Sequence, residues 1–243
     1  MSNLNNFLKK IVNQLIENTP RDFQEKNKHN IRLFKIKLKT VYDSFFSGLG
    51  KISRQIHRPK FPNHPNGAIN LHLGCGAINH PEFINIDALN LPHIHFVRKI
   101  DNLKPFKNES VKLIYASHCL EHFPIDKVPI VLKEWHRVLK EDGILRLSVP
   151  DFDLILNIYR DTGRNMEDVI RILMGGQDYE YNFHLCSFNE NYLSQLLKDV
   201  GFKMVRKWTP GTDKMTSFDD WSGRPVLIAG RAYPVSLNLE AVK

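Results

Sequence analysis

The apolar side chains along the 243-residue chain follow two different patterns. Residues 3–18 and 31–45 place apolar side chains three or four positions apart, which is typical of amphipathic helices, although the second stretch also alternates in part as a strand would. Residues 48–68 are rich in Gly, Pro, Asn and His, a composition typical of a linker. Short apolar runs then alternate with helical patterns. We therefore expect a helical N-terminal extension over residues 1–60 and a folded domain over residues 61–243.

The second part of the chain predicts a sheet of mostly parallel strands. We expect one helix to start at Asp126 and to close at Gly143, and another to run from Asn189 to Gly201. Because strands that alternate with helices build parallel sheets covered on both faces, the pattern indicates an α/β fold. The predicted strands cover residues 69–73, 83–86, 95–100, 111–116, 144–149, 202–208 and 226–233.

The net charge of +8 is concentrated near the N-terminus. Residues 1–60 hold 13 basic and 4 acidic side chains, whereas the rest of the chain holds 21 and 22. A basic amphipathic segment suits a lid or dimer contact, an anionic membrane surface, or nucleic acid. Aromatic side chains are not interleaved with its charges, which argues against stacking on bases and makes nucleic acid the less favoured partner.

The three cysteines, Cys75, Cys119 and Cys186, lie far apart and show no CxxC spacing. This arrangement argues against a disulfide framework or a structural zinc site, and it suits a reducing compartment. No apolar run reaches the roughly 18–20 residues that a membrane span needs, and the N-terminus lacks the pattern of a secretory signal. We expect a cytoplasmic protein, peripheral at the inner face of the membrane if the basic segment binds lipid.

A glycine-rich turn follows the first predicted strand, in the run Leu73-Gly74-Cys75-Gly76. Glycines let backbone N–H groups approach a ligand that a Cβ atom would exclude, and ligands of open α/β sheets bind at such turns. The next strand ends in Asp87, whose carboxylate can accept hydrogen bonds from both hydroxyls of a ribose. Taken alone, each feature has a simpler interpretation, a tight turn for the glycines and a loop cap for Asp87.

Further segments make the pattern more specific, because LHLGCG is followed by INIDAL, by IDNLKPFKNESVKLIYASHCLEHF and by VLKEWHRVLKEDGILRLSVPD. Together they resemble the class I S-adenosylmethionine-dependent methyltransferases, above all a branch known as predicted methyltransferases, some of which occur in polysaccharide-biosynthesis clusters. The likeness is good over residues 68–150, looser toward the end, and leaves out residues 1–60. It implies a Rossmann-like, mostly parallel seven-stranded sheet with helices on both faces, and S-adenosyl-L-methionine as cofactor.

The resemblance assigns cofactor contacts to the ends of four strands. It places the glycine turn under the methionine part of the cofactor, the end of the second strand at the ribose, the residues after the third strand at the adenine, and the end of the fourth strand near the methionine. A core position for Leu103 and a turn cap for Asp101 are the alternative interpretations. In chain order the implied residues are Leu73, Gly74, Cys75, Gly76, Asp87, Ala88, Asp101, Asn102, Leu103 and Ser117.

The interval from Gly76 to Asp87 departs from the family pattern. Methyltransferases usually place a full helix there, and a parallel crossover takes about a dozen residues or more, so we expect a truncated crossover. The run GCGAIN also lacks the third glycine of GxGxxG. That difference argues against a dinucleotide, because a pyrophosphate needs the N-terminus of the following helix as an anion site.

Candidate catalytic side chains follow the fourth strand, in the run SHCLEH. His118 or His122 suits a base that removes the proton of an acceptor hydroxyl, with anchoring of the loop as the alternative for His122. Asp151, after the fifth strand, suits a base or an acceptor contact, with the cap of the following helix as the alternative. His184 lies where relatives often carry a histidine at the mouth of the active site. With Glu121 these histidines could bind a divalent metal, but their spacing does not demand one and we expect none.

The resemblance and the polar strand end predict an S-adenosylmethionine-dependent methyltransferase that acts on a sugar hydroxyl or another small metabolite. Two other functions stay open. A non-catalytic methyltransferase-like module would bind partners without turnover, and an RNA methyltransferase would suit the pI of about 9.3 but not the nearly neutral domain. The expected partners are a small-molecule or glycan acceptor and, through residues 1–60, a second copy of the chain in a homodimer or a membrane surface.

Overall fold

The computed structural model describes residues 19–20, 27, 58–64 and 66–243. The helices predicted over residues 3–18 and 31–45 therefore lie outside the described residues, as does nearly all of the predicted extension. In the part that is described, no helix is both long enough and apolar enough to cross a bilayer.

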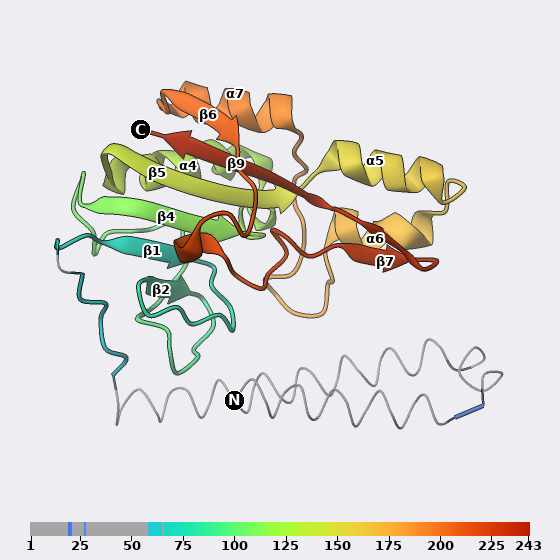
Figure 1. The fold of residues 1–243 in the computed structure, drawn as a ribbon, viewed down its shortest axis with the longest axis horizontal. Helices are drawn as coiled ribbons and strands as arrows, with labels where there is room; N and C mark the ends of the chain where they lie inside the picture. The colour runs from blue at the N-terminus through green and yellow to red at the C-terminus, as the bar shows by residue number, and fades with distance from the viewer. Residues whose placement is uncertain (1–18, 21–26, 28–57, 65) are drawn as a thin grey trace.

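A seven-stranded sheet forms the centre of the described structure (Figure 1). Its strands are β1 (Asn70–Leu73), β2 (Ile84–Asp87), β3 (Phe96–Val97), β4 (Val111–Ser117), β5 (Leu139–Pro150), β6 (Met204–Lys207) and β9 (Ser236–Val242). They lie in the order β3-β2-β1-β4-β5-β9-β6, so strand order reverses between β1 and β4. The first five strands pair in parallel, while β9 pairs antiparallel with both β5 and β6. This topology confirms the predicted Rossmann-like, mostly parallel sheet.

One face of the sheet is covered by two helices that pack against each other, α4 (Val128–Val138) and α7 (Glu190–Val200) (Figure 1). Both bury an apolar stripe in the main core, which also contains the inward side chains of β1, β4, β5 and β9. The side chain of Asn189 accepts a hydrogen bond from the backbone N–H of Tyr192 (3.1 Å) and so caps α7, and Gly201 ends the helix with a left-handed backbone. The sequence predicted both of these boundaries.

The opposite face of the sheet is covered, among the described residues, by the loop of residues 208–224 that follows β6. Successive strand residues point to opposite faces, so His72 of β1 lies on this face, away from α4. Its ring stacks on Phe218 with 4.9 Å between centroids, and Phe83 packs edge-on against both rings. The connection from β1 to β2 contains no helix, as predicted, and a segment from the C-terminal part of the chain fills its place.

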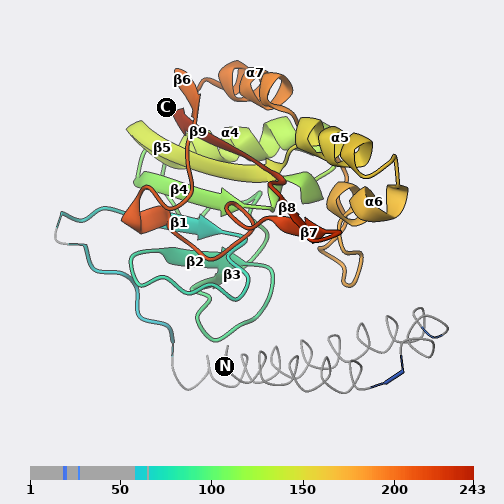
Figure 2. The ribbon, with the colours of Figure 1, turned by 45° about the vertical axis from the view of Figure 1, so that its right-hand side comes forward.

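A smaller layer lies beyond the carboxyl ends of the parallel strands (Figure 2). It consists of α5 (Phe152–Asp161), α6 (Met166–Met174) and the hairpin of β7 (Val226–Ile228) and β8 (Arg231–Tyr233). This layer has its own small core, made of Ile155, Ile158, Val169, Tyr233 and Val235. Single helical turns complete the described elements: η1 (Leu120–His122), η2 (Ile125–Lys127) and η3 (Lys214–Thr216).

The helix predicted between Asp126 and Gly143 is shorter at both ends. Asp126 lies in the turn η2, and α4 begins at Val128 without a side-chain cap. The helix ends at Val138, because Leu139 has an extended backbone and already pairs with β4. Gly143 therefore lies within β5, where an added Cβ atom would come within 2.7 Å of a backbone carbonyl oxygen. The glycine serves close backbone packing and not helix termination.

The strand predicted over residues 226–233 is wrong as a single strand. Ala229 and Gly230 have positive φ values of 49° and 81°, which reverse the chain and make a two-residue hairpin turn between β7 and β8. This hairpin forms a separate two-stranded sheet. The strand that completes the main sheet is β9, which lies between β5 and β6 and which the sequence interpretation did not include.

Candidate active site

The turn after β1 has a backbone that glycine adopts without strain. Gly74 (φ 63°) and Gly76 (φ 52°) both lie in the left-handed region. An added Cβ atom at Gly74 would come within 2.8 Å of the Cβ atom of Cys119, so the turn packs directly against the segment that follows β4. The same atom at Gly76 would meet nothing within 4 Å. The turn therefore presents bare backbone to an open space.

Asp87, the last residue of β2, places a buried carboxylate beside this turn; its exposed fraction is 7%. Oδ2 accepts a hydrogen bond from the backbone N–H of Gly76 (2.7 Å), and Oδ1 accepts one from that of Leu89 (2.8 Å). Burial raises the pKa of the Asp87 carboxyl, while these backbone hydrogen bonds partly counter the shift. Each carboxylate oxygen has two lone pairs, so both can accept a further hydrogen bond from a bound hydroxyl.

A cavity of about 400 Å³, here called the glycine-turn cavity, opens at this point. Five of the residues that the resemblance assigns to the cofactor line it, namely Gly74, Gly76, Asp87, Ala88 and Asp101. Two other wall residues, Tyr179 and Tyr181, suit from sequence either the wall of an acceptor pocket or the packing of their loop, and their role stays a prediction. Sequence reasoning assigned no ligand contact to the rest of the wall outside the histidines, which includes Leu89, Arg98, Lys99, Ile100, Cys119, Phe123, Pro124 and Lys127. Arg98, Lys99, Pro124 and Lys127 lie in segments that no local motif distinguishes.

The other five assigned residues lie behind the wall of this cavity or beside it. Leu73 and Leu103 are fully buried core residues, which is the alternative interpretation of Leu103. Cys75 is also buried, and Asn102 turns its amide oxygen toward the backbone of its own loop. Ser117 is half-buried at the end of β4. Their contact with a cofactor stays a prediction.

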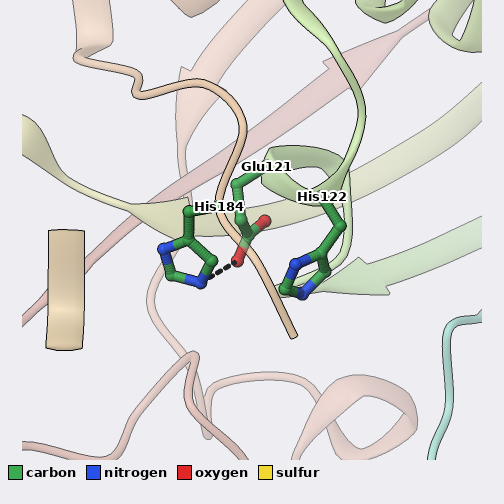
Figure 3. Close-up of side chains that lie close together, drawn as sticks. All are labelled: Glu121, His122 and His184. Atoms are coloured by element: carbon green, nitrogen blue, oxygen red, sulfur yellow. Dashed lines mark ion pairs between the residues drawn. The ribbon is translucent and has the colours of Figure 1, made fainter. Parts of the chain in front are cut away.

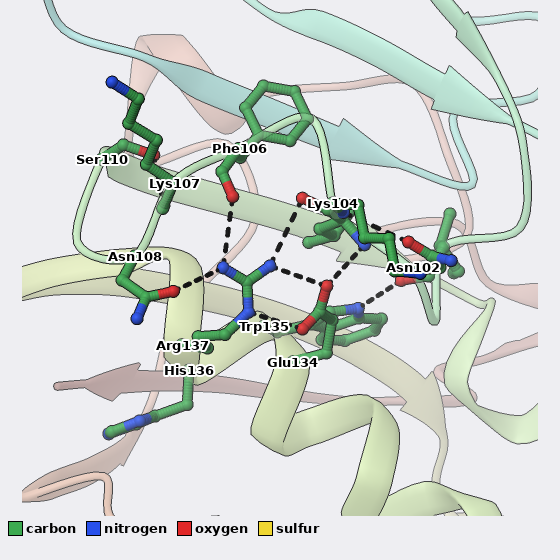
Figure 4. A network of polar contacts seen from close by, with 12 residues as sticks. Asn102, Lys104, Phe106, Lys107, Asn108, Ser110, Glu134, Trp135, His136 and Arg137 are labelled. Carbon is green, nitrogen blue, oxygen red and sulfur yellow. Dashed lines mark hydrogen bonds and ion pairs between the residues drawn. The ribbon is translucent and has the colours of Figure 1, made fainter.

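The loop that carries Asp101 is fixed from α4 (Figure 4). Oε1 of Glu134 accepts a hydrogen bond from the backbone N–H of Leu103 (2.6 Å), and Glu134 is paired with Arg137 at 2.7 Å. Arg137 also donates to the carbonyl of Phe106 (3.2 Å). The hydrogen bond from the Arg137 guanidinium lowers the pKa of the Glu134 carboxyl, which keeps it ionised. The backbone of the loop at this edge of the glycine-turn cavity is therefore held in place by side chains of α4.

A second cavity of about 770 Å³, here called the α6 cavity, lies beside the first, toward α6 and the β7–β8 hairpin. Its wall combines charged side chains, aromatic rings and apolar hairpin residues, among them Pro150, Glu167, Asp168, Arg171, Ile172, Asn182, His184, Trp221, Val226, Leu227, Ile228 and Val235. His118, His122 and Tyr179 line both cavities. The two spaces therefore meet at the loop that follows β4.

His118 stands at this junction with a positive φ of 50°, an uncommon backbone for a residue other than glycine. Its Nδ1 atom lies 3.4 Å from Oε1 of Glu121, and its Nε2 atom lies 2.8 Å from Oγ of Ser236. The same Oγ lies 2.7 Å from the carbonyl of Trp221. A serine hydroxyl has one proton, so Ser236 donates either to Trp221 or to His118. The imidazole is held between a carboxylate and a hydroxyl.

Glu121, His122 and His184 converge from two segments of the chain (Figure 3). Nε2 of His184 lies 3.8 Å from Oε1 of Glu121, and Nδ1 of His122 lies 2.9 Å from the carbonyl of Phe183. Burial favours a raised pKa for the Glu121 carboxyl, but the surrounding imidazoles, that of His118 first, hold this pKa below its usual value. Burial lowers the pKa of His184.

The sequence of residues 40–207 matches the model of a family described as a methyltransferase domain. This match spans more than half of the chain. The chain belongs to this methyltransferase family. The matched region starts within the segment that was predicted as an extension. No curated protein matches the chain.

Several solved structures are similar to this methyltransferase. An S-adenosylmethionine-dependent methyltransferase from Archaeoglobus fulgidus is 15% identical, with 84% of this chain and 99% of that chain covered and a TM-score of 0.46. A possible histamine N-methyltransferase from Thermotoga maritima is 16% identical, with 88% and 99% covered and a TM-score of 0.47. The 1,6-didemethyltoxoflavin-N1-methyltransferase of Burkholderia thailandensis, solved with S-adenosylhomocysteine, is 15% identical, with 89% of each chain covered and a TM-score of 0.48. These scores are too low to add to the family assignment.

Family membership makes the chain an S-adenosylmethionine-dependent enzyme, and the glycine-turn cavity suits that cofactor. Its volume of about 400 Å³ lies in the range of small-molecule sites. The bare backbone at Gly76 suits the amino-acid part of the cofactor, and the buried carboxylate of Asp87 suits the ribose. When bound, the cofactor supplies an already activated methyl group, so the tasks left to the protein are positioning and the exclusion of water.

Asp151 does not itself line either cavity, although its neighbour Pro150 lines the α6 cavity. Its side chain accepts a hydrogen bond from the backbone N–H of Asp153 (3.0 Å) and caps α5, which is the second of its two interpretations from sequence. Burial raises the pKa of Asp151. His184, in contrast, lines the α6 cavity together with His118 and His122. The structure thus brings the three candidate histidines together and leaves the aspartate outside.

Proposed function

We propose that this methyltransferase methylates a hydroxyl oxygen of a small polar acceptor, with sugars and other glycans as the favoured class. The observation that carries the proposal is the junction of the two cavities at His118 and His122. Methyl transfer needs the donor and the acceptor in line and shielded from water. The glycine-turn cavity suits the donor, and the α6 cavity, at about 770 Å³, has room for a sugar-sized acceptor.

The wall of the α6 cavity supports a polyhydroxylated acceptor. Asp168 and Arg171 on α6 and Asn182 after it offer hydrogen-bond acceptors and donors, while Trp221 offers an apolar ring face. A sugar presents hydroxyls at its edge and C–H groups on its face, so both kinds of side chain suit it. A polyanion such as RNA is less suited, because acidic side chains contribute to the wall and binding of a phosphate backbone depends on cationic ones.

The acceptor hydroxyl gives up its proton as the new O–C bond forms. We propose His118 as the group that takes this proton, because it lies at the junction of the cavities; the acceptor hydroxyl would replace Ser236 Oγ as the hydrogen-bond partner of Nε2. Glu121 acts as a positioning residue, since its carboxylate faces Nδ1 of the ring at 3.4 Å and directs Nε2 away from itself. His122 is the alternative proton acceptor, although its contacts with two backbone carbonyls suit an anchoring role.

The test is methyl transfer by the full-length protein to separate acceptor pools, namely free and nucleotide-linked sugars, phenols, amines and tRNA. S-adenosylhomocysteine should form with a sugar pool, and mass spectrometry should place the added methyl group on oxygen. His118→Ala should lower turnover by about 100-fold or more and leave the affinity for S-adenosylhomocysteine unchanged. Transfer confined to amines or tRNA would contradict the acceptor class, and cofactor binding without any transfer would favour a non-catalytic module.

A further inference from the structure

Glu121, His122 and His184 form a cluster, here called the EHH cluster, whose metal-ligating atoms all lie within 4.8 Å of one another (Figure 3). His122 and His184 line the α6 cavity, and His122 also lines the glycine-turn cavity. Glu121 lies behind them with an exposed fraction of 1%. Two imidazoles and a carboxylate therefore meet at the place where donor and acceptor are proposed to meet.

The Glu121 carboxylate has an unusual environment. Within the described part of the structure, both of its oxygens are buried and neither makes a hydrogen bond of good geometry; the nearest donor group is the His118 ring. Its polar neighbours are imidazole nitrogens, that of His118 at 3.4 Å and that of His184 at 3.8 Å. A buried carboxylate without hydrogen bonds is costly unless a positive charge faces it. That charge must come from protons on the imidazoles or from a bound cation.

Each histidine of the EHH cluster has one ring nitrogen or ring edge beside a backbone group. Nδ1 of His122 lies 2.9 Å from the carbonyl of Phe183, and the backbone of Ile172 lies near the His184 ring. Metal-bound histidines commonly donate the second ring N–H to such a backbone carbonyl, which fixes the tautomer and leaves the other nitrogen for the ion. His184 turns its Nε2 atom toward the Glu121 carboxylate.

The second ring nitrogen of His122 also faces a backbone carbonyl. Nε2 lies 3.1 Å from the carbonyl oxygen of His118, while Nδ1 faces the carbonyl of Phe183. A neutral imidazole has one N–H, so it can satisfy only one of these carbonyls, and its remaining lone pair would face the other oxygen. Either a second proton or a cation near that lone pair removes the conflict.

We propose that the EHH cluster binds one divalent transition-metal ion, of the zinc or manganese kind, with its open coordination positions toward the α6 cavity. Two imidazoles and one carboxylate are the ligands of known zinc and non-haem iron sites. Magnesium and calcium prefer oxygen ligands, so they fit this cluster poorly. Only the catalytic role of the ion rests on the proposed function. An acceptor hydroxyl coordinated at an open position would lose its proton more readily.

The experiment is a calorimetric titration of the full-length protein, first stripped with a chelator, with zinc chloride or manganese chloride. We expect about one ion per chain with micromolar or tighter affinity, and no comparable heat with magnesium chloride. Loss of an outer partner of a metal ligand already weakens binding about 10- to 100-fold, so Glu121→Gln and His184→Ala should each weaken it by at least about 100-fold. The control His64→Ala removes a histidine outside the cluster and should keep the wild-type affinity.

Two outcomes would overturn the inference: no stoichiometric binding of either ion, or the same affinity in the cluster variants as in His64→Ala. In the first case the cluster holds protons and not a metal. If a cluster variant fails to fold, X-ray absorption at the zinc edge of the wild-type protein decides, because the inference requires about two imidazole ligands near 2.0 Å and excludes sulfur coordination. A parallel titration with S-adenosylhomocysteine keeps the two proposals apart, since cofactor binding without zinc binding removes this inference alone.

Discussion

The two cavities of this methyltransferase are built in different ways. The wall of the glycine-turn cavity that carries the glycine turn depends mainly on backbone, because Gly74 and Gly76 leave their amides uncovered and backbone N–H groups hold Asp87 in place. The α6 cavity is walled by side chains from distant segments, such as Arg171 on α6 and Trp221 in the loop after β6. The geometry of the glycine turn therefore follows from the sheet, whereas that of the α6 cavity follows from contacts between distant segments.

This difference predicts which residues can be substituted without loss of the fold and which cannot. A cavity made of backbone tolerates few substitutions, because the same atoms define the fold and the contact with the ligand. A cavity made of side chains can take a new ligand by substitution while the sheet remains as it is. We therefore expect changes in the glycine turn to affect folding and cofactor affinity together. Changes at residues that line the α6 cavity alone should affect only the acceptor.

The largest effect is expected for Gly74→Ala. A left-handed backbone costs a non-glycine residue about 1–2 kcal/mol, and the new Cβ atom, within 2.8 Å of the Cβ atom of Cys119, adds about 1–3 kcal/mol of overpacking. The free energy of unfolding in urea should fall by about 2–5 kcal/mol, and binding of S-adenosylhomocysteine should weaken as well.

Two matched glycines provide the controls for this prediction. Gly67→Ala has the same backbone requirement (φ 65°) but meets nothing within 4 Å, so it should cost only about 1–2 kcal/mol. Gly76→Ala also meets no protein atom, yet it points into the glycine-turn cavity and should weaken cofactor binding. Equal losses of stability at Gly74 and Gly67 would show that the turn does not pack against Cys119 as described.

A smaller effect is expected where the C-terminal loop covers the first strands. Burial lowers the pKa of His72 from 6.5 to about 3, so below pH 6.5 the unfolded chain takes up a proton that the folded chain does not. Stability should therefore fall as the pH drops from 6.5 toward 3, by about 2 kcal/mol at pH 5. His72→Phe, surrounded by the rings of Phe83, Tyr115 and Phe218, should remove this part of the acid sensitivity.

Urea unfolding at pH 7.5 and pH 5 measures this difference. His64→Ala serves as the control, since its ring lies outside the aromatic cluster and the variant should keep the loss of stability shown by the wild-type protein. A loss in His72→Phe as large as that in the wild-type protein would mean that His72 is protonated in the folded state. The loop of residues 208–224 would then cover this face less closely than the structure shows.

The smallest effect is expected for Trp221→Ala. The indole is 46% exposed and lines the α6 cavity, so its removal should leave stability and S-adenosylhomocysteine affinity within about 0.5 kcal/mol of the wild-type values. KM for the acceptor should rise about 10-fold, which corresponds to the loss of about 1.4 kcal/mol of binding. Phe61→Ala, another exposed aromatic residue, should leave this KM unchanged. A weakened cofactor affinity in Trp221→Ala would contradict the claim that this residue contributes to acceptor binding and not to cofactor binding.

The cofactor side of the fold could be predicted from sequence because its signals are local. Gly74 and Gly76 lie in the turn directly after β1, and Asp87 ends the adjacent strand β2. Their residue types follow from the backbone and the hydrogen bonds that each position requires. The caps of α7 at Asn189 and Gly201 could be predicted for the same reason, because a cap depends on one residue and its immediate neighbours.

The acceptor side could not be predicted in the same way because it depends on contacts between distant segments. The pairing of Leu139 with Val111 ended α4 before Gly143, and no pattern within the helix indicates that pairing. Trp221 enters the α6 cavity only because its loop folds back over a face that lacks a crossover helix. Asp151 differs from these examples, because its contact is local: its side chain caps the helix that begins at the next residue.

The central claim, that the glycine-turn cavity holds the methyl donor, is tested most directly by calorimetric titration of the wild-type protein and Asp87→Ala with S-adenosylhomocysteine. The account predicts binding by the wild-type protein and a loss of about 1.5–3 kcal/mol in the variant, or roughly 10- to 150-fold in Kd, because hydrogen bonds to a charged carboxylate are removed. A melting curve shows whether the variant is folded. No binding by the wild-type protein, or equal affinity in a folded Asp87→Ala, would contradict the claim.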